Sequence, residues 1–150
     1  MAYWLMKSEP NAFSIDDLAK VKVEPWDGVR NYQARNMMRD QMQIGDLVFF
    51  YHSNCKVPAI VGMIKIVKAG YADDTAFNPD AKYYDPKSKP DNPRWYRVDV
   101  EFIEKFTQEI SLQILKQQAE LADLALVKKG SRLSIMPVSE PEWQHILGLK

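Results

Sequence analysis

One ten-residue segment, residues 26–35 with the sequence WDGVRNYQAR, combines residue types that suit a flat ligand carrying phosphate. It supplies an aromatic plane, a conformationally permissive glycine, cations and two carboxamides at the predicted start of a helix, where free N–H groups favour anions. A nucleobase within a strand needs such a stacking face, edge hydrogen bonds and positive charge. The alternative is structural: Trp26 fills the core and Arg30 pairs with Asp27.

Catalytic and metal chemistry find weaker support in the sequence. His52 and Cys55 are three residues apart at a predicted strand end, a spacing that seldom aligns a nucleophile with its base. Zinc needs three or four ligands, and only the distant His145 could join them. The adjacent acidic pairs 16–17 and 73–74 are predicted to be solvated surface. With neither a G-x-G-x-x-G motif nor a P-loop, we expect no catalytic residue, no metal and no cofactor.

The overall charge excludes a general, charge-driven nucleic-acid binder. Twenty Lys and Arg residues balance 20 Asp and Glu residues, and the formal net charge is zero. Phosphate contacts would therefore need a local basic patch. The alternative is that these basic residues are ordinary solvated charges on the surface of a helix. The predicted patch consists of Lys20, Lys22, Arg30, Arg35 and Arg39.

The elements around these residues follow from periodicity and capping signals. Residues 2–6 are predicted to form a buried strand, and Ser14 with Asp17 resembles a capping box for a helix over 15–19. Residues 21–23 are a predicted short strand. Apolar residues spaced at i, i+3, i+4 and i+8 then predict a helix of about three turns from Asn31 to the turn at 45–46.

The second half of the chain alternates strands with short helices. Strands are predicted over 47–53, 59–67, 96–102 and 133–136, with a bulge or close approach at Gly62, and helices over 111–115, 121–126 and 139–147. The aperiodic connection 70–94 is predicted to be functional or mobile. Five or six mostly antiparallel strands interrupted by helices indicate an α+β domain built on a small curved sheet or barrel.

Length and cysteine content set the remaining limits. A chain of 150 residues predicts a single domain over 1–150. Its lone cysteine, its lack of a signal-like apolar run and its lack of a membrane-spanning stretch predict a cytoplasmic protein without membrane contact. We expect a monomer.

Several motifs together resemble one known family. They are WLMKSEP at 4–10, WDGVRNYQARN at 26–36, Gly-Asp at 45–46, FYHS at 50–53, Asp-Pro at 85–86 and Pro-Arg-Trp at 93–95. This set is similar to the EVE domain family, which includes the thymocyte nuclear protein group and belongs to the PUA-like superfamily. The resemblance implies a PUA-like pseudobarrel flanked by short helices. It also implies a non-catalytic pocket for a modified nucleobase, notably modified cytosine such as 5-methylcytosine, in DNA or RNA.

The resemblance also implies which residues form the pocket, between Trp26 and the edge at 51–53. Trp26 and Trp95 would be its aromatic walls, and three polar side chains would read the edge of the base. The full predicted set is Ser8, Glu9, Trp26, Arg30, Asn31, Ala34, Tyr51, His52, Ser53 and Trp95. Without the basic N-terminal tail of eukaryotic relatives, a bacterial cytoplasmic form is expected.

Two other functions stay open at this point. Lys7 with Glu9 beside a pocket could supply the base of a hydrolase acting on modified nucleosides. The connection 70–94 and the acidic stretches could instead serve a protein-interaction module. The sequence does not choose between DNA and RNA, identify the modified base or show whether the connection closes over a ligand.

Overall fold

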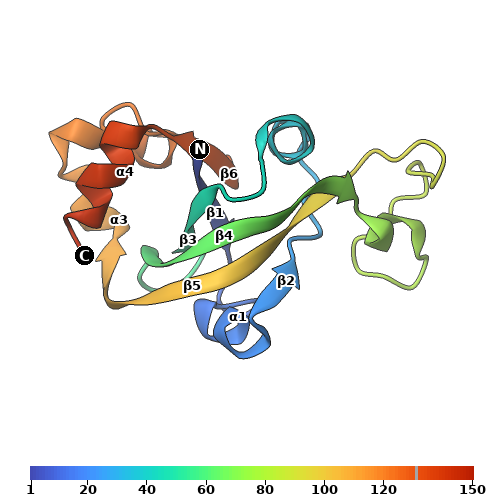
Figure 1. The fold of residues 1–150 in the computed structure, drawn as a ribbon, viewed down its shortest axis with the longest axis horizontal. Helices are drawn as coiled ribbons and strands as arrows, with labels where there is room; N and C mark the ends of the chain where they lie inside the picture. Colours follow the sequence, from blue (N-terminus) through green and yellow to red (C-terminus); the bar gives the residue numbers. More distant parts are fainter. Residues whose placement is uncertain (131) are drawn as a thin grey trace.

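A computed structural model describes residues 1–130 and 132–150, and its six strands form one sheet in the order β2-β5-β4-β3-β1-β6 (Figure 1). The strands are β1 (Tyr3–Ser8), β2 (Val23–Pro25), β3 (Leu47–His52), β4 (Ala59–Ala72), β5 (Tyr96–Ser111) and β6 (Ile135–Val138). Only β1 and β3 pair in parallel among the pairs of this described sheet; the others are antiparallel. The predicted α+β class with five or six mostly antiparallel strands is confirmed, with six strands observed.

The parallel pair β1–β3 determines where polar groups gather. Its register places Lys7 beside Tyr51 and Ser8 beside His52, so both strands end at the same edge of the sheet. The backbone N–H of Ser53 donates to the carbonyl of Ser8 at 3.0 Å and extends this pairing by one step. The chain ends that leave the two strands are therefore held side by side.

Four α-helices flank the sheet within the described residues, and each begins where a side chain caps it. They are α1 (Ile15–Val21), α2 (Tyr32–Asn36), α3 (Leu112–Lys116) and α4 (Glu140–Leu147), and α2 continues as a π-helical turn over Met37–Gln41. The N-caps are Ser14, Asn31, Ser111 and Ser139. Each accepts a hydrogen bond from an otherwise unpaired N–H of the first turn, as the sequence predicted for Ser14.

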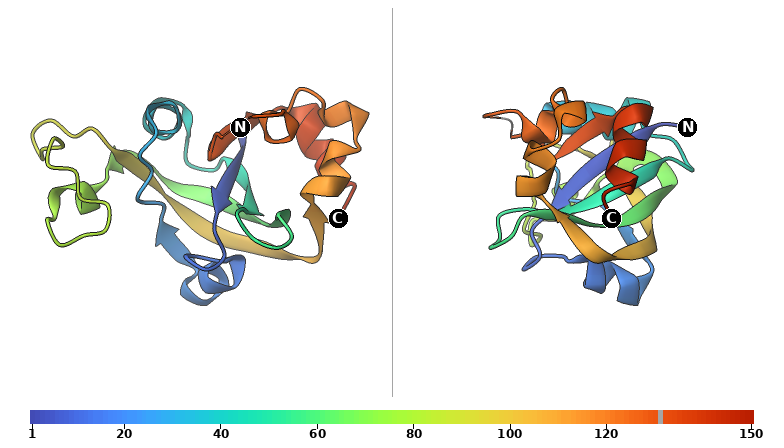
Figure 2. Two further views of the ribbon diagram at one scale, coloured as in Figure 1. Left: turned by 180° about the vertical axis from the view of Figure 1, so that it is seen from behind. Right: turned by 90° about the vertical axis from the view of Figure 1, so that its left-hand side faces the viewer.

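The antiparallel ribbon β4–β5 is much longer than its sequence pattern suggested. It connects the loop at 73–95 to the α3 and α4 region, and the two lie at opposite ends of the molecule in Figure 1 and in the left-hand view of Figure 2. Register shifts recur along it, and a Cβ at Gly62 would lie 2.4 Å from the carbonyl oxygen of Glu104. Gly62 therefore allows the predicted bulge, and the shifts break the alternation by which a strand is recognised.

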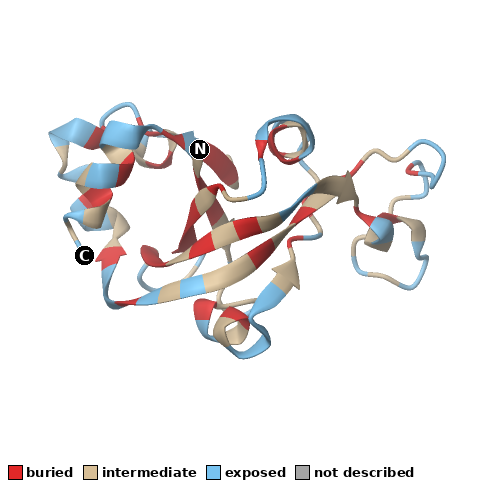
Figure 3. Cartoon of the chain, in the orientation of Figure 1, coloured by how far each residue is buried: buried red, intermediate tan, exposed pale blue. Residues whose placement is uncertain are grey.

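Both faces of the sheet are packed, which explains why its central strands show no polar face. Met6 and Phe50 belong to one core with α1 and α2, whereas Leu5 and Phe49 belong to the other with Trp143 of α4. The Phe49 and Trp143 rings stack at 3.8 Å between centroids. Figure 3 shows the buried residues concentrated on these strands and on the inner sides of the helices.

Several predicted boundaries are wrong by a few residues. Residue 21 ends α1 instead of starting a strand, because Lys22 adopts a φ of 72° and its N–H caps the carbonyl of Leu18. The predicted helix 121–126 is two 3₁₀ turns, at 119–121 and 125–127, and the last strand lies at 135–138. The long connection begins only after β4 ends. No helix in the described residues has the length and apolar character needed to cross a membrane.

Candidate functional site

A cavity of about 780 Å³ opens at the edge where β1 and β3 end, within the size range of small-molecule sites. We call it the indole cavity, after the one tryptophan among its described lining residues. These residues are Lys7, Ser8, Glu9, Ala12, Phe13, Glu24, Pro25, Trp26, Asp27, Gly28, Val29, Arg30, Ser53, Lys82, Tyr83, Arg132 and Ser134. The cavity is open between Trp26 and Ser53, whereas Tyr51 and His52 of the predicted edge at 51–53 do not line it.

Trp26 forms a fixed wall of this cavity. Its backbone N–H donates to the carbonyl of Val98 at 2.7 Å, directly after β2 pairs with β5. Its ring meets Phe50 edge to face at 5.5 Å, and only 8% of the residue is exposed. Both interpretations of Trp26 from the sequence therefore apply, since the residue packs in the core and still contributes to the cavity lining.

A buried carboxylate holds the segment that follows Trp26. Asp73 accepts hydrogen bonds from the Gly28 N–H at 2.9 Å, from Arg30 Nη1 at 3.0 Å and from both the N–H and the hydroxyl of Thr75. Burial by itself would raise the pKa of Asp73, but these hydrogen bonds outweigh it and lower the pKa. The prediction that residues 73–74 are both solvated is wrong for Asp73, which is fully buried. Arg30 accordingly pairs with Asp73, not with Asp27.

Arg30 fastens the long loop to the cavity wall. Its guanidinium donates to the carbonyl oxygens of Tyr83 and Val29, to Asp73 and to the Thr75 hydroxyl, which engages all five of its N–H hydrogens. Its cationic carbon also lies 5.6 Å from the centre of the Tyr83 ring. The predicted phosphate contact of Arg30 thus has no free donor to make it, and we expect Arg30 to position the wall instead.

Gly28 lets Tyr83 approach the wall closely. The residue has a φ of 77°, and a Cβ added there would lie 2.5 Å from the Tyr83 ring. Glycine adopts this backbone conformation at no steric cost and leaves room for the ring. The loop predicted to be functional therefore delivers an aromatic residue to the cavity lining.

Polar side chains at the ends of β1 and β3 also line the cavity. The Ser8 hydroxyl donates its hydrogen to the carbonyl of Phe13 at 2.5 Å. It can therefore interact with a ligand as a hydrogen-bond acceptor. Ser53 lies beside it, and the exposed Glu9 accepts a hydrogen bond from the Asn54 side chain. Three of the predicted edge-reading or acidic residues are thus brought together.

The cavity also contains charged groups with shifted pKa values. Burial lowers the pKa of Lys7, since removal from water disfavours the ammonium ion. Burial, with the nearby charge of Asp27 next, raises the pKa of Glu24. Loss of hydration, with the charge of Asp73 next, raises the pKa of Asp27. Two carboxyl groups with raised pKa values and a half-buried lysine give the lining both hydrogen-bond acceptors and a donor.

Five predicted pocket residues lie outside the indole cavity. Asn31 caps α2 through a 2.9 Å hydrogen bond to the Ala34 N–H, and Ala34 itself is fully buried. Tyr51 and His52 point to other places because side chains alternate along β3: Tyr51 reaches the core of α3 and α4, and His52 reaches α1. Trp95 stacks on Tyr32 at 4.8 Å and donates its indole N–H to Asp85.

His52 serves as a structural acceptor. Its Nε2 accepts a hydrogen bond from the Ile15 N–H at 3.1 Å, at the first turn of α1. Burial is the main cause that lowers the pKa of His52, which keeps the ring neutral and able to accept. This matches the ordinary interpretation of a lone histidine on an apolar strand.

The other predicted phosphate contacts do not form one patch around the cavity. Arg35 donates to the carbonyl of Arg94 at 2.6 Å, and Arg39 pairs with its neighbour Asp40. Lys20 and Lys22 are exposed at the end of α1. None of these four residues is among the described residues that line the indole cavity.

Sequence reasoning missed several lining residues. Tyr83 and Lys82 were hidden in the aperiodic loop, whose unusual length was the available signal. Ser134 and Arg132 precede the short strand β6, whose boundary was misplaced. Across residues 1–130 and 132–150, no cluster of three His, Cys, Asp or Glu side chains could hold a metal ion.

Comparisons with known proteins find relatives that are similar to this chain in both sequence and fold. A family model described as "EVE domain" matches residues 2–149. Mouse thymocyte nuclear protein 1 is 46% identical over 169 residues, which cover 99% of this chain and 73% of the relative. A crystal structure of a Pseudomonas syringae protein is 52% identical, with a TM-score of 0.95 and 99% of both chains covered. A crystal structure of human THYN1 protein in complex with 5-methylcytosine-containing DNA is 44% identical, with a TM-score of 0.92, covering 99% of this chain and 97% of that one.

Proposed function

The chain belongs to the EVE domain family, and we propose that it binds a modified nucleobase, a modified cytosine such as 5-methylcytosine, in DNA or RNA without altering it chemically. One observation carries the proposal: an open cavity next to Trp26, lined by polar groups and large enough for a flat heterocycle. The structure of human THYN1 protein with 5-methylcytosine-containing DNA, similar over nearly the whole chain, supports it.

The lining suits a cytosine better than a thymine. The exocyclic amine of cytosine is a donor that carboxylates accept, and Glu24 and Asp27 both line the cavity. Ser8 and Ser53 add hydroxyl groups, and Lys7 adds a donor for the carbonyl oxygen of the base. The indole of Trp26 supplies stacking, which is tolerant of base identity and contributes about 1–3 kcal/mol per base.

The energies make this a selective but weak binder of duplex DNA. One buried methyl group is worth about 0.8 kcal/mol, or about fourfold in affinity. Extracting a base from a duplex costs a few kcal/mol, which single strands do not require. A neutral chain with few phosphate contacts should also show a shallow dependence on salt.

Calorimetric titration of nucleosides tests the proposal directly. We expect 5-methyl-2′-deoxycytidine to bind more tightly than 2′-deoxycytidine by about fourfold, and thymidine to bind more weakly than both because it lacks the amine. Trp26→Ala should abolish binding, whereas Trp26→Phe, which keeps an aromatic face, should retain part of it. Equal affinity for all three nucleosides, or full binding by Trp26→Ala, would refute the proposal.

The same cavity supports one second candidate, a hydrolase of modified nucleosides. Lys7 and Glu9 both line it, and the lowered pKa of Lys7 favours a lysine that can accept a proton. Incubation with 5-methyl-2′-deoxycytidine, followed by mass spectrometry, separates the two candidates. Unchanged nucleoside supports a reader, and turnover that Lys7→Ala abolishes supports an enzyme.

The wider setting is part of the proposal. We propose a single domain over residues 1–150, acting as a monomer in the bacterial cytoplasm, with modified DNA or RNA as its partner. Relatives include both a bacterial protein and proteins named as nuclear, so the compartment is tested separately by imaging a fluorescent fusion. Sedimentation analysis tests the monomer.

A further inference from the structure

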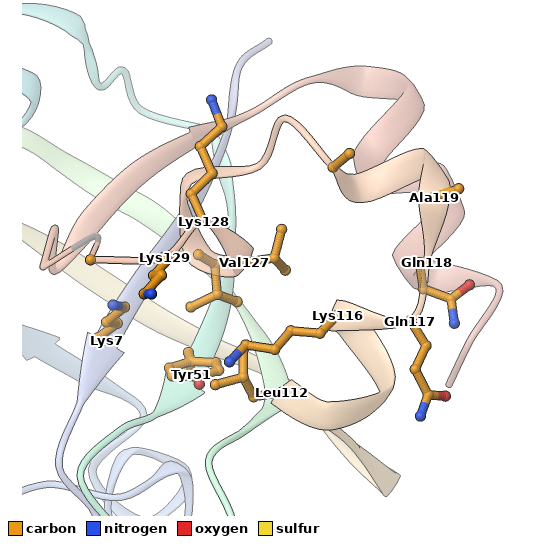
Figure 4. Close-up of a pocket in the computed structure, with 13 residues that line it drawn as sticks. Lys7, Tyr51, Leu112, Lys116, Gln117, Gln118, Ala119, Val127, Lys128 and Lys129 are labelled. Carbon is orange, nitrogen blue, oxygen red and sulfur yellow. The ribbon is translucent and has the colours of Figure 1, made fainter.

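A second cavity, of about 840 Å³, lies beside the indole cavity and is lined by lysines (Figure 4). We call it the lysine cavity, since Lys7, Lys116, Lys128 and Lys129 all line it. Its described lining contains no aspartate or glutamate, in a chain whose acidic and basic residues are equal in number. This concentration of one charge is therefore local and not a property of the surface as a whole.

Residues of two paired sheet strands line one part of this cavity. Lys7 and Tyr51 are register partners on the parallel strands β1 and β3, and the Lys7 ammonium lies 5.9 Å from the centre of the Tyr51 ring. Figure 4 shows Lys116 and Lys129 extending toward the Tyr51 end of the cavity, whereas Lys128 extends away from it. Lysines from a strand, from α3 and from the segment before β6 thus line one cavity.

Two polar groups that line this cavity can interact with an anion. Tyr51 is 2% exposed, and burial with the Cys55 charge raises its pKa to about 12, so its hydroxyl remains a neutral donor. The hydroxyl is not among the buried polar atoms of the described residues that lack a partner, and it is open to the cavity that Tyr51 lines. Lys7 is half-buried without an ion-pair partner among the described residues, an arrangement that an anion would stabilise.

The two cavities meet at one residue. Lys7 lines both, and the chain before β6 borders the lysine cavity at Lys128 and Lys129 and the indole cavity at Arg132 and Ser134. If one base of a nucleic-acid strand occupied the indole cavity, the neighbouring phosphates of that nucleic-acid strand would therefore lie near the end of β1. A phosphate group of that same strand is therefore the anion best placed to occupy the lysine cavity.

We propose that the lysine cavity binds backbone phosphate of the nucleic-acid strand whose modified base occupies the indole cavity. Lys7, Lys116 and Lys129 supply charge, and the Tyr51 hydroxyl donates a hydrogen bond. The inference rests on the proposed function, and free phosphate is the other source of the same chemistry.

Salt dependence is the readout that a merely structural role would not change. A fluorescein-labelled single strand with one 5-methylcytosine is titrated with protein by anisotropy at several KCl concentrations. Each lost phosphate contact makes the negative slope of log affinity against log salt shallower by about 0.7 and weakens binding about fourfold at 0.15 M salt. Lys116→Gln/Lys129→Gln should therefore make the negative slope shallower by about 1.4 and weaken binding by about 14-fold at 0.15 M salt.

Matched variants separate charge from hydrogen bonding. Lys87→Gln/Lys89→Gln removes two exposed lysines of the long loop, outside both cavities, and should change neither quantity. Tyr51→Phe keeps the buried ring and removes only the donor, so affinity should fall about fivefold with an unchanged slope. A slope and an affinity for Lys116→Gln/Lys129→Gln equal to those of the loop variant would overturn the inference.

Two further ligands distinguish this inference from the function on which it rests. The free nucleoside carries no phosphate, so its affinity reports on the indole cavity alone. An abasic strand of equal length reports on phosphate contacts alone, and it should lose affinity with Lys116→Gln/Lys129→Gln. If the nucleoside fails to bind while the abasic strand responds, the proposed function fails and the phosphate site stands. If inorganic phosphate shifts the Tyr51 ring resonances in NMR spectra but neither strand responds, the assignment to a nucleic acid is overturned.

Discussion

Asp73 is the residue whose removal should affect both stability and binding. Its buried carboxylate joins the Gly28 segment to the long loop through Arg30 and Thr75. Removing one partner of a buried ion pair costs about 3–5 kcal/mol, because the remaining charge is left without compensation. Arg30 has a side chain 23% exposed and can be hydrated after the change, so we expect a value near the lower limit, about 3 kcal/mol, for Asp73→Ala.

Urea unfolding followed by tryptophan fluorescence measures this cost, with thermal melting as a second assay. A loss of about 3 kcal/mol corresponds to a fall in Tm of roughly 6–12 °C for a chain of this size. Asp74→Ala is the matched control, since the side chain of Asp74 is 71% exposed and its pair with Arg97 is a surface contact worth at most about 1 kcal/mol. Asp73→Ala should also weaken nucleoside binding, because Gly28 and Tyr83 lose their common anchor.

The pH dependence provides an independent check on the same carboxylate. The folded-state pKa of Asp73 is lowered below its unfolded value, so its stabilisation is present above about pH 4 and is lost as pH falls through the folded pKa. The stability difference between the wild type and Asp73→Asn should therefore shrink in acid below about pH 4. Equal costs for Asp73→Ala and Asp74→Ala, or a difference independent of acid, would refute this account of the loop.

Three further changes have expected outcomes that follow from single contacts. The lowered pKa of His52 predicts that stability falls as pH drops below about 6.5, and His52→Gln should remove that part of the pH profile in urea unfolding. Gly28→Ala should cost about 1–2 kcal/mol for its φ and also displace Tyr83, so it should weaken nucleoside binding. Gly45→Ala is the control, because Gly45 has a φ of 97° and an added Cβ there would meet no atom within 4 Å. It should therefore show only the backbone cost in stability. Equal nucleoside binding by the Gly28→Ala and Gly45→Ala variants would contradict the role of Tyr83. Trp143→Ala removes a fully buried ring and should cost about 3–5 kcal/mol in the same assay, and a cost below about 1 kcal/mol would contradict its placement in the core.

The sequence determined the elements that depend on near neighbours. Ser14 with Asp17 and Ser139 with Glu142 form the capping boxes that start α1 and α4, because their partners lie three residues away. The motif around Trp26 also identified the segment that lines the cavity. Ser8 and Ser53 were predicted to lie near it, and the parallel pairing of β1 with β3 brings them there.

Tertiary structure alone decided which charges are available to a ligand. Asp73 is adjacent to the exposed Asp74, yet it is buried because Gly28 and Arg30, more than forty residues away, donate to it. That contact engages Arg30 and excludes it from the phosphate role that its sequence context suggested. Lys7, placed by the sequence only beside a possible catalytic pocket, instead lines two cavities at once. The physical reason is that burial and pairing of a charge depend on long-range strand register, whereas a helix cap depends only on its own turn.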